Sequence, residues 1–157
     1  MNSKLNPHYV VGLVDGEGCF SVTFNKHKNN RLLEIRLLFE IELREDDKEI
    51  LERVRKTLDC GNIYYLNYER YKKWKPHYKY KVSNIKDIST KVIPFFQKYP
   101  LQAKKKKSFA LFKKVAKFIL QKKHLTIDGI EKIKYLKEDF IRDSLDAGKP
   151  HVQWGAE

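Results

Sequence analysis

The sequence predicts one α+β domain in which helices gather on one face of an antiparallel sheet and leave the other face free. The first reason is the order of hydrophobic patterns, which runs helix, hairpin, helix, hairpin and then three more helices. The second is that polar and apolar side chains alternate through both hairpins, as expected when one face of a sheet is solvated. The chain has 157 residues, enough for one core. We expect residues 1–145 to form the domain and residues 146–157 to form a loose tail.

The first helix is expected to begin at Asn6 and Pro7, because Asn is a favoured N-cap and Pro is favoured at the first helical position. An apolar run follows and stops at residues 15–18, which read DGEG. The pattern then changes to alternation through residues 19–25 and, after a polar turn, through residues 34–43. These two segments predict the first hairpin.

The second helix and second hairpin follow directly. Asp46 and Glu49 have the spacing of a capping box, which predicts a helix start, and Gly61 is expected to end that helix. Alternation between Asn62 and Ser83 predicts the second hairpin.

Three helices are expected in the last third of the domain. The first of them covers about residues 85–99 with a kink at Pro94, because proline removes a helical hydrogen bond. The next covers about residues 104–122. Thr126 is expected to cap the last helix, whose isoleucine and leucine residues recur on one face.

Positive charge is concentrated in two segments of a chain whose net charge is +13. Residues 101–123 hold nine lysines and no acid, and residues 62–83 hold six basic residues interleaved with tyrosine and tryptophan. Phosphates bind Lys and Arg through release of counterions, so this pattern favours a nucleic-acid partner. A solvated lysine-rich surface is the alternative.

The composition also excludes several classes of protein. No apolar run reaches the roughly 18 residues of a membrane span, and the N-terminus lacks a signal-peptide pattern, so we expect a soluble intracellular protein without a membrane partner. Its compartment, prokaryotic cytoplasm or organelle matrix, stays open. Cys19 and Cys60 lie apart from each other and from any His cluster, which predicts two small buried thiols rather than a zinc or disulfide site.

The DGEG segment is the candidate for chemistry. Gly12 and Gly16 lie on one helix face, where each costs about 1 kcal/mol relative to alanine, so a second helix packed closely against them explains both. Asp15 and Glu17 lie at the helix C-terminus, where the dipole disfavours negative charge. If two copies of the helix pair about a twofold axis, their Glu17 carboxylates come near each other, which favours either a shared proton or a bound hard cation such as Mg²⁺. The alternative is a glycine-rich turn with solvated acids.

These residues resemble a known family. The stretch VVGLVDGEG at residues 10–18 is similar to the LAGLIDADG signature, and the element order is similar to that of a single-motif LAGLIDADG homing endonuclease. Further resemblances are Phe39-Glu40-Ile41, Gly61-Asn62-Ile63 and Tyr99-Pro100-Leu101. Together they span about residues 6–145.

The resemblance implies a saddle-shaped DNA-binding sheet, a homodimer joined through the motif helices, and intron homing. It implies Mg²⁺-dependent or other hard-cation-dependent hydrolysis of both strands of a long, near-palindromic double-stranded DNA. By resemblance, Glu17 and the backbone carbonyl of Gly16 bind the metal, while Glu17 and Lys104 are catalytic. Lys105, Lys106 and Lys107 share the lysine assignment with Lys104. Asp15 is more often structural in the family.

Two departures keep other functions open. Val11 replaces a small residue of the signature, and Leu43 falls where some relatives carry a polar residue that orients water. A non-cleaving DNA-binding protein or an intron RNA maturase is therefore the alternative, although retention of Glu17 favours cleavage. A basic RNA-binding domain is a further alternative, without an RNP or KH signature. Residues 125–129 superficially suggest a second motif but lack the second acid, which leaves one motif and favours the homodimer.

Outward residues of both hairpins form the candidate DNA-reading surface. A β-ribbon fits the major groove, where Arg reads guanine, Asn adenine and Glu cytosine. The alternative is a solvated sheet face. Lys72, Lys73, Lys75 and residues 104–107 are expected to contact phosphates. The predicted DNA-binding residues are Ser21, Thr23, Asn25, Glu34, Arg36, Glu40, Asn62, Tyr64, Lys79, Lys81 and Ser83.

Overall fold

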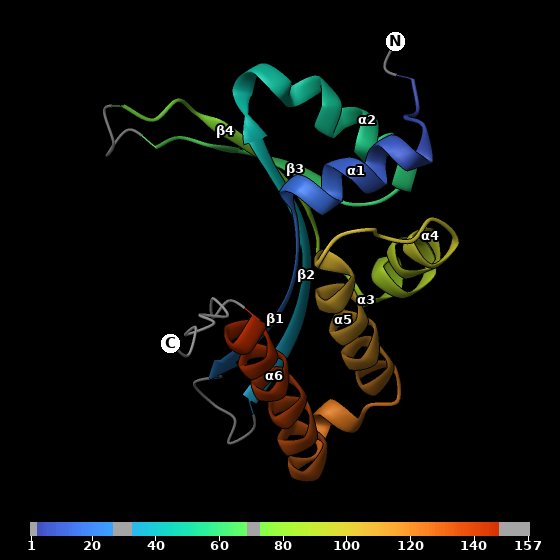
Figure 1. Cartoon of the computed structure of the whole chain (residues 1–157), viewed down its shortest axis with the longest axis vertical. Coiled ribbons are helices and arrows are strands. Elements are labelled where there is room, and N and C mark those ends of the chain that lie inside the picture. The colour runs from blue at the N-terminus through green and yellow to red at the C-terminus, as the bar shows by residue number, and fades with distance from the viewer. Residues whose placement is uncertain (1–2, 27–32, 69–72, 148–157) are drawn as a thin grey trace, which may run out of the picture.

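A four-stranded antiparallel sheet, covered by helices on one face, forms the framework of the protein (Figure 1). The computed structural model describes residues 3–26, 33–68 and 73–147. The strand order is β1-β2-β4-β3, so both predicted hairpins are present and β2 joins them. The strands are β1 (Gly18–Lys26), β2 (Leu33–Arg44), β3 (Asn62–Leu66) and β4 (His77–Val82).

Helical segments connect and cover these strands in the predicted order. The helices are α1 (Pro7–Glu17), α2 (Lys48–Leu58), α3 (Ile85–Asp87), α4 (Ile93–Lys98), α5 (Lys105–Leu120) and α6 (Ile127–Ala147). Three short segments adjoin them: the 3-10 turns η1 (Glu45–Asp47) and η3 (Lys123–Leu125), and the π-helical segment η2 (Ile88–Val92). No helix among the described residues is long and apolar enough to cross a membrane. The α+β prediction, with helices on one face of the sheet, is confirmed.

Two predicted helix caps are present. The Asn6 side chain accepts a hydrogen bond from the backbone N–H of His8 at 2.9 Å, with Pro7 as the first residue of α1. The Thr126 hydroxyl accepts one from the N–H of Gly129 at 3.0 Å, at the start of α6. Each side chain satisfies a backbone N–H that has no partner within its helix.

The predicted boundaries of α2 are wrong at both ends. Asp46 makes no cap but pairs with Arg44 at 3.0 Å, and Asp47 occupies the N-cap position without a side-chain hydrogen bond. At the other end, Asp59 takes a left-handed conformation with φ of 56° and donates its N–H to the Arg55 carbonyl, so the helix ends before Gly61. Asp is one of the few non-glycine residues that adopt this conformation readily, because its short polar side chain bonds locally.

The predicted third helix is present as one run of helical residues, and its middle part is π-helical. The segment η2 joins α3 to α4 without a gap, and Pro94 lies in the first turn of α4. Proline has no N–H to close the preceding turn, and a π-turn is one way in which a helix absorbs that loss. The predicted irregularity at Pro94 is therefore present as a π-helical segment directly before α4.

Two limits of the predicted elements also differ. Ser83 lies beyond the end of β4 at Val82. The helix α6 continues through Ala147, so the first two residues of the predicted tail are helical, and residues 148–157 lie outside the described residues. Lys72 and residues 27–32 of the predicted first turn also lie outside them.

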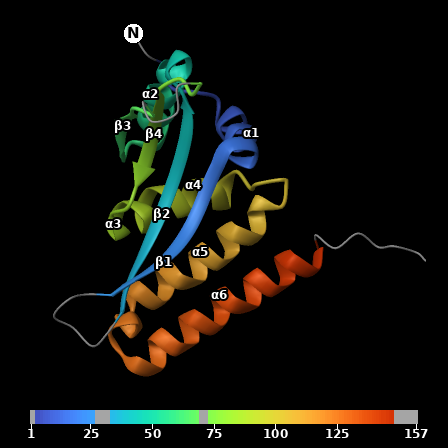
Figure 2. The ribbon, with the colours of Figure 1, turned by 90° about the vertical axis from the view of Figure 1, so that its left-hand side faces the viewer.

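The hydrophobic core lies between the sheet and the helices and determines which sheet face stays open. The ring of Phe20 stacks on Phe39 with centroids 4.8 Å apart and contacts the rings of Phe96, Phe109 and Phe112 from α4 and α5. Figure 2 shows the opposite, uncovered side of the sheet, with α4 and α5 behind it. The open face is thus formed by the side chains that alternate with these buried ones.

The helix α6 lies beside the β1 edge of the sheet. The Lys137 ammonium donates a hydrogen bond to the backbone carbonyl of Val22 at 2.6 Å and lies 5.1 Å from the centre of the Phe24 ring. This contact covers part of an edge strand whose backbone groups otherwise face solvent.

Candidate nucleic-acid interface and cleavage site

The acidic residue Glu17 is held at the junction of α1 and β1. It is the last residue of α1, exposed, and Gly18 begins the strand directly after it. A Cβ on Gly18 would lie 2.6 Å from Cγ1 and 2.8 Å from the carbonyl oxygen of Val14, which is why glycine is required at this close approach. The helix therefore passes into the strand without a loop, and Glu17 directly precedes the first residue of β1.

One face of α1 is not covered by any of the residues that the structure describes. Gly12 and Gly16 are exposed, and a Cβ built on either would have nothing within 4 Å. Tyr9 on the same helix is 51% exposed. Val10, Val11 and Val14 are buried on the opposite side, so the departure at Val11 falls in the protein's own core rather than on the bare face. The packing of a second helix on this face remains a prediction. The described residues leave space for it at Gly12 and Gly16.

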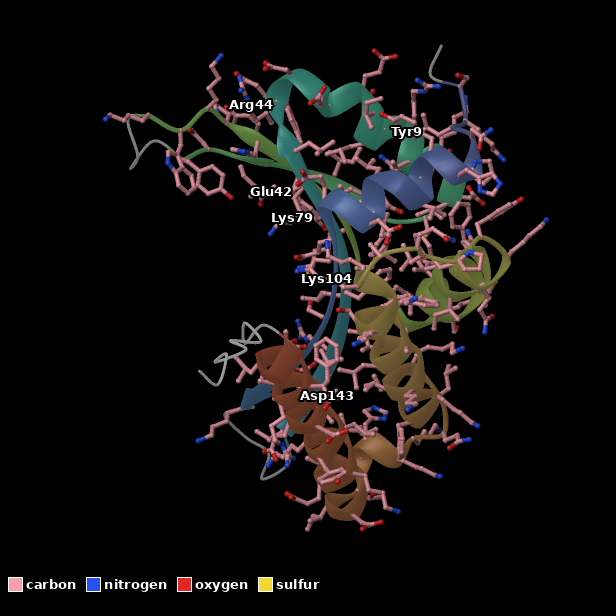
Figure 3. The ribbon with its side chains drawn as sticks, in the orientation of Figure 1. Tyr9, Glu42, Arg44, Lys79, Lys104 and Asp143 are labelled. Carbon is pink, nitrogen blue, oxygen red and sulfur yellow. The ribbon has the colours of Figure 1, made fainter. Side chains whose placement is uncertain are left out.

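Asp15 ties the end of α1 to the loop before α5. Its two carboxylate oxygens accept hydrogen bonds from the backbone N–H groups of Gln102, at 2.9 Å, and Ala103, at 3.1 Å. Lys104 is the next residue in this loop, and Figure 3 shows it beside the sheet below the end of α1. The contact brings together two segments that lie far apart in the sequence, and it occupies the Asp15 carboxylate in a structural role.

The structure separates the four consecutive lysines that the sequence leaves equivalent. Lys104 is exposed and directly follows the loop held by Asp15, whereas Lys105, Lys106 and Lys107 lie in the first turn of α5. Lys107 lines a groove between α5 and α6 together with Asp139 and Asp143. Of the four lysines, Lys104 is therefore the one that directly follows the residues bonded by Asp15.

Two lysines of α5 lie on the covered side of the sheet. Phe109, Phe112 and Val115 of α5 are buried, and α5 packs on the covered face. Lys113 and Lys117 are exposed on that helix, outside its buried stripe.

The predicted reading residues lie together on the open face, with one exception. Across the strands Thr23 is paired with Arg36, Asn25 with Glu34, and Lys81 with both Glu40 and Asn62. Tyr64 is paired with Lys79, and Ser21 with Leu38. Ser83 follows the end of β4 and is not part of the strand array. Cys19, expected to be buried, is exposed because the alternation of β1 places it on this face beside Glu40.

Charges on this face are mixed rather than uniformly positive. The Lys79 ammonium lies 3.8 Å from a carboxylate oxygen of Glu40 and 3.7 Å from one of Glu42. Arg36 pairs with Glu34 at 3.0 Å. Acids and bases therefore alternate across the strands, which suits discrimination among base edges better than attraction to phosphate alone.

An aromatic cluster at the second hairpin was not predicted from the sequence. The Tyr68 hydroxyl donates to both carboxylate oxygens of Glu42, at 3.1 and 3.2 Å, and its ring meets those of Trp74 and His77 edge-on at 5.7 and 5.3 Å. Desolvation and the Glu42 carboxylate raise the pKa of Tyr68. Alternation along β2 places Glu42 on the open face, so its position was available from the sequence. The contact of Tyr68 with it was not, because Tyr68 lies beyond the end of β3.

The acids of the chain fit part of a metal site. Among the described residues, no three His, Cys, Asp or Glu side chains converge on one point. Glu17 offers a carboxylate that makes no hydrogen bond or ion pair with any described residue, and the Gly16 carbonyl belongs to the last turn of α1, where carbonyls lack helical partners. Both are hard oxygen donors of the kind Mg²⁺ prefers. One chain thus supplies part of a coordination shell.

Comparisons with known proteins found similar endonucleases. A family model described as LAGLIDADG endonuclease matches residues 10–116. The chain is 30% identical over 130 residues to a protein of Neurospora crassa named probable intron-encoded endonuclease 2; the match covers 82% of this chain and 28% of that protein's length.

Two solved structures have the same fold. The homing endonuclease I-TnaI superposes with a TM-score of 0.75 and 30% identity over 85% of this chain and 86% of its own. I-SmaMI, bound to an uncleaved DNA target in the presence of calcium ions, superposes with a TM-score of 0.77 and 30% identity over 85% of this chain and 44% of its own. The fold thus corresponds to nearly all of one chain and to less than half of the other.

Proposed function

The chain belongs to the LAGLIDADG endonuclease family, and from this premise we propose that it is a homing endonuclease that acts as a homodimer. Its substrate is a long, near-palindromic double-stranded DNA, of which it hydrolyses both strands with Mg²⁺ or another hard divalent cation. The observation that carries the proposal is the bare glycine face of α1, with the exposed Glu17 at its end and the loop of Lys104 tied beside it.

Pairing of two chains through α1 is supported by the uncovered face and by the comparisons. The fold matches 86% of the I-TnaI chain but only 44% of the DNA-bound I-SmaMI chain, as expected if some relatives carry two such units in one chain and others one. Close approach of two α1 helices at Gly12 and Gly16 would bring the two Glu17 carboxylates together about the twofold axis.

Each residue near the end of α1 has a distinct role in the proposed reaction. Glu17 and the Gly16 carbonyl would hold the cation, which when bound supplies Lewis-acid activation of a water and of the leaving oxygen. Lys104 places an ammonium at the scissile phosphate, where it stabilises negative charge that develops during attack. Asp15 holds the Lys104 loop through hydrogen bonds from two backbone N–H groups, and we assign it this structural role rather than a metal-binding one. Attack on phosphorus with departure of the 3′ oxygen leaves 3′-hydroxyl and 5′-phosphate ends.

The open sheet face is proposed to lie in the major groove. The strand β2 has 12 residues, which at about 3.3 Å each extend about 40 Å, comparable to about ten to twelve base pairs. A dimer would then cover roughly twice that length, with half-sites related by the twofold axis of the protein. Because the Neurospora relative is named an intron-encoded endonuclease, we propose that the target is an intron insertion site.

A cleavage screen tests this function. The purified full chain is incubated with a randomised duplex library in Mg²⁺, and cut molecules are sequenced. The proposal predicts cleavage of both strands at one family of near-palindromic sequences and no cleavage when the cation is chelated. Equal cleavage of all sequences contradicts it. Selective binding without any cleavage would instead support the non-cleaving DNA-binding alternative, which the hydrophobic Leu43 keeps open.

A further inference from the structure

We infer that Glu42 and Lys79 together read one C·G base pair in each half of the target, and that Tyr68 holds the Glu42 carboxylate in position for it. The inference rests on the proposed function, because it requires a duplex on the open face of the sheet. It assigns a specificity-determining role to side chains that take no part in the proposed cleavage step.

Glu42 and Lys79 are cross-strand neighbours on β2 and β4, the two inner strands of the sheet. They face each other in the β2-β4 register, and Figure 3 shows both on the open side of the sheet. The Lys79 ammonium lies 3.7 Å from a Glu42 oxygen, and the two side chains are 29% and 35% exposed. An acceptor and a donor are thus presented side by side, both partly desolvated.

The Glu42 carboxylate is fixed before any ligand arrives. The Tyr68 hydroxyl donates to both of its oxygens, and the Tyr68 ring is itself packed against Trp74 and His77. A side chain already held in one conformation loses less entropy on binding, which is the benefit of preorganisation. The raised pKa of Tyr68 keeps its hydroxyl protonated, so it remains a donor to Glu42.

Both side chains retain capacity for an external partner. A carboxylate has about four lone-pair sites, of which Tyr68 and Lys79 occupy only part, and an ammonium has three donors. The pair can therefore accept one hydrogen bond from a base edge and donate one to it without losing its internal contacts.

A C·G pair matches this arrangement best. In the major groove it presents the N4 donor of cytosine next to the O6 and N7 acceptors of guanine. An A·T pair also sets a donor beside an acceptor, but its N7 and O4 acceptors lie on opposite sides of the N6 donor, so the ammonium meets one acceptor instead of the adjacent O6 and N7 of guanine. The carboxylate therefore selects cytosine, and the ammonium selects the guanine paired with it.

The test is a binding selection with the full chain, a randomised duplex library and Ca²⁺ in place of Mg²⁺, followed by sequencing of the bound pool. The wild type is expected to prefer C·G at one position of each half-site by roughly 5- to 150-fold. Glu42→Gln is expected to change that preference to A·T, because an amide pairs with both N6 and N7 of adenine, and to leave the other positions unchanged. Tyr68→Phe is expected to keep cytosine but to weaken the preference.

Two matched variants control for charge and for loss of a hydroxyl. Glu131→Gln is the control for charge, because it removes one negative charge from α6, away from the open face. Tyr65→Phe is the control for loss of a hydroxyl, because Tyr65 lies in the same hairpin as Tyr68 but its ring packs on Tyr78. Neither is expected to change the base preference at any position.

The outcomes separate the two proposals. A wild-type chain that selects no sequence overturns the proposed function and this inference with it. A wild-type chain that selects a site, with Glu42→Gln selecting the same bases at every position, overturns the inference alone. If Glu42→Gln does not fold, as judged by circular dichroism, Tyr68→Phe decides, because an unchanged cytosine preference in that variant contradicts the role of Tyr68 and Glu42.

Discussion

The carboxylate of Asp15 accepts a hydrogen bond from the backbone N–H of Gln102 at 2.9 Å, which joins the end of α1 to the loop before α5. A second bond, from Ala103, makes the contact bidentate. Through these two bonds a single side chain sets where Lys104 lies relative to Glu17. The first acid of the motif thus has a structural explanation that does not require it to bind metal.

Asp15→Ala should loosen this loop while leaving the rest of the fold intact. Because the two N–H groups are near the surface and water can replace the lost acceptor, we expect a loss of about 0.5–1.5 kcal/mol in the free energy of unfolding. Cleavage should fall more than stability does, because Lys104 is no longer held in place. Urea denaturation and single-turnover cleavage measure the two effects. Asp143→Ala, at an exposed acid of α6, is the control, and equal cleavage by both variants would contradict the positioning role.

Gly12→Leu should abolish association of two chains without unfolding either. A Cβ at Gly12 would meet no described residue within 4 Å, so a larger side chain is accommodated, but it would occupy the space that a second α1 needs. Sedimentation velocity should show a dimer for the wild type and a monomer for the variant. Lys113→Leu adds the same side chain to the exposed side of α5 and should leave the dimer unchanged. A dimeric Gly12→Leu would place the interface elsewhere.

Gly18→Ala, unlike Gly12→Leu, should destabilise the fold of the single chain. Its Cβ would lie 2.6 Å from the Val14 side chain, and the junction of α1 and β1 leaves little room for relaxation. We expect the free energy of unfolding to fall by about 1–3 kcal/mol, as for other overpacked sites. Thermal denaturation of Gly18→Ala beside Gly12→Ala measures the contrast, and equal stability of the two variants would refute it.

Tyr80→Phe should destabilise the core through one lost hydrogen bond. Tyr80 is fully buried and its hydroxyl donates to the Cys60 carbonyl at 2.8 Å, so phenylalanine leaves that carbonyl without this donor. The expected loss is about 1–3 kcal/mol in the free energy of unfolding, measured in urea. Tyr65→Phe, at a residue 53% exposed, should change stability little. A Tyr80→Phe variant as stable as the wild type would show that the bond makes no net contribution.

The sequence predicted those features that depend on neighbouring residues. Alternation placed all but one of the reading residues on the same face, and the caps at Asn6 and Thr126 followed from side-chain chemistry alone. The sequence-based prediction was wrong where a contact with a distant segment, or a competing interaction between neighbouring residues, determines the local conformation. Asp46 pairs with Arg44 instead of capping α2, and Asp59, two residues before Gly61, is the residue that ends this helix in a left-handed conformation.

Contacts between distant segments could not be predicted from spacing. Asp15 meets Gln102 across 87 positions of sequence, and Tyr68 reaches Glu42 across 26. Both contacts depend on how the sheet and the helices pack, which no local pattern encodes. They are also the contacts that position Lys104 and Glu42, so the sequence identified the family signature but not the supports of its site.

Cleavage by Glu17→Gln tests the central claim most directly. The amide keeps the size of the side chain but removes its negative charge, so it should bind a divalent cation poorly while leaving the open sheet face unchanged. We predict that the wild type cuts both strands of its selected duplex in Mg²⁺, whereas Glu17→Gln binds that duplex with similar affinity in Ca²⁺ and does not cut it in Mg²⁺. A Glu17→Gln variant that still cuts the selected duplex would contradict the assignment of Glu17 as the metal-binding residue of the site.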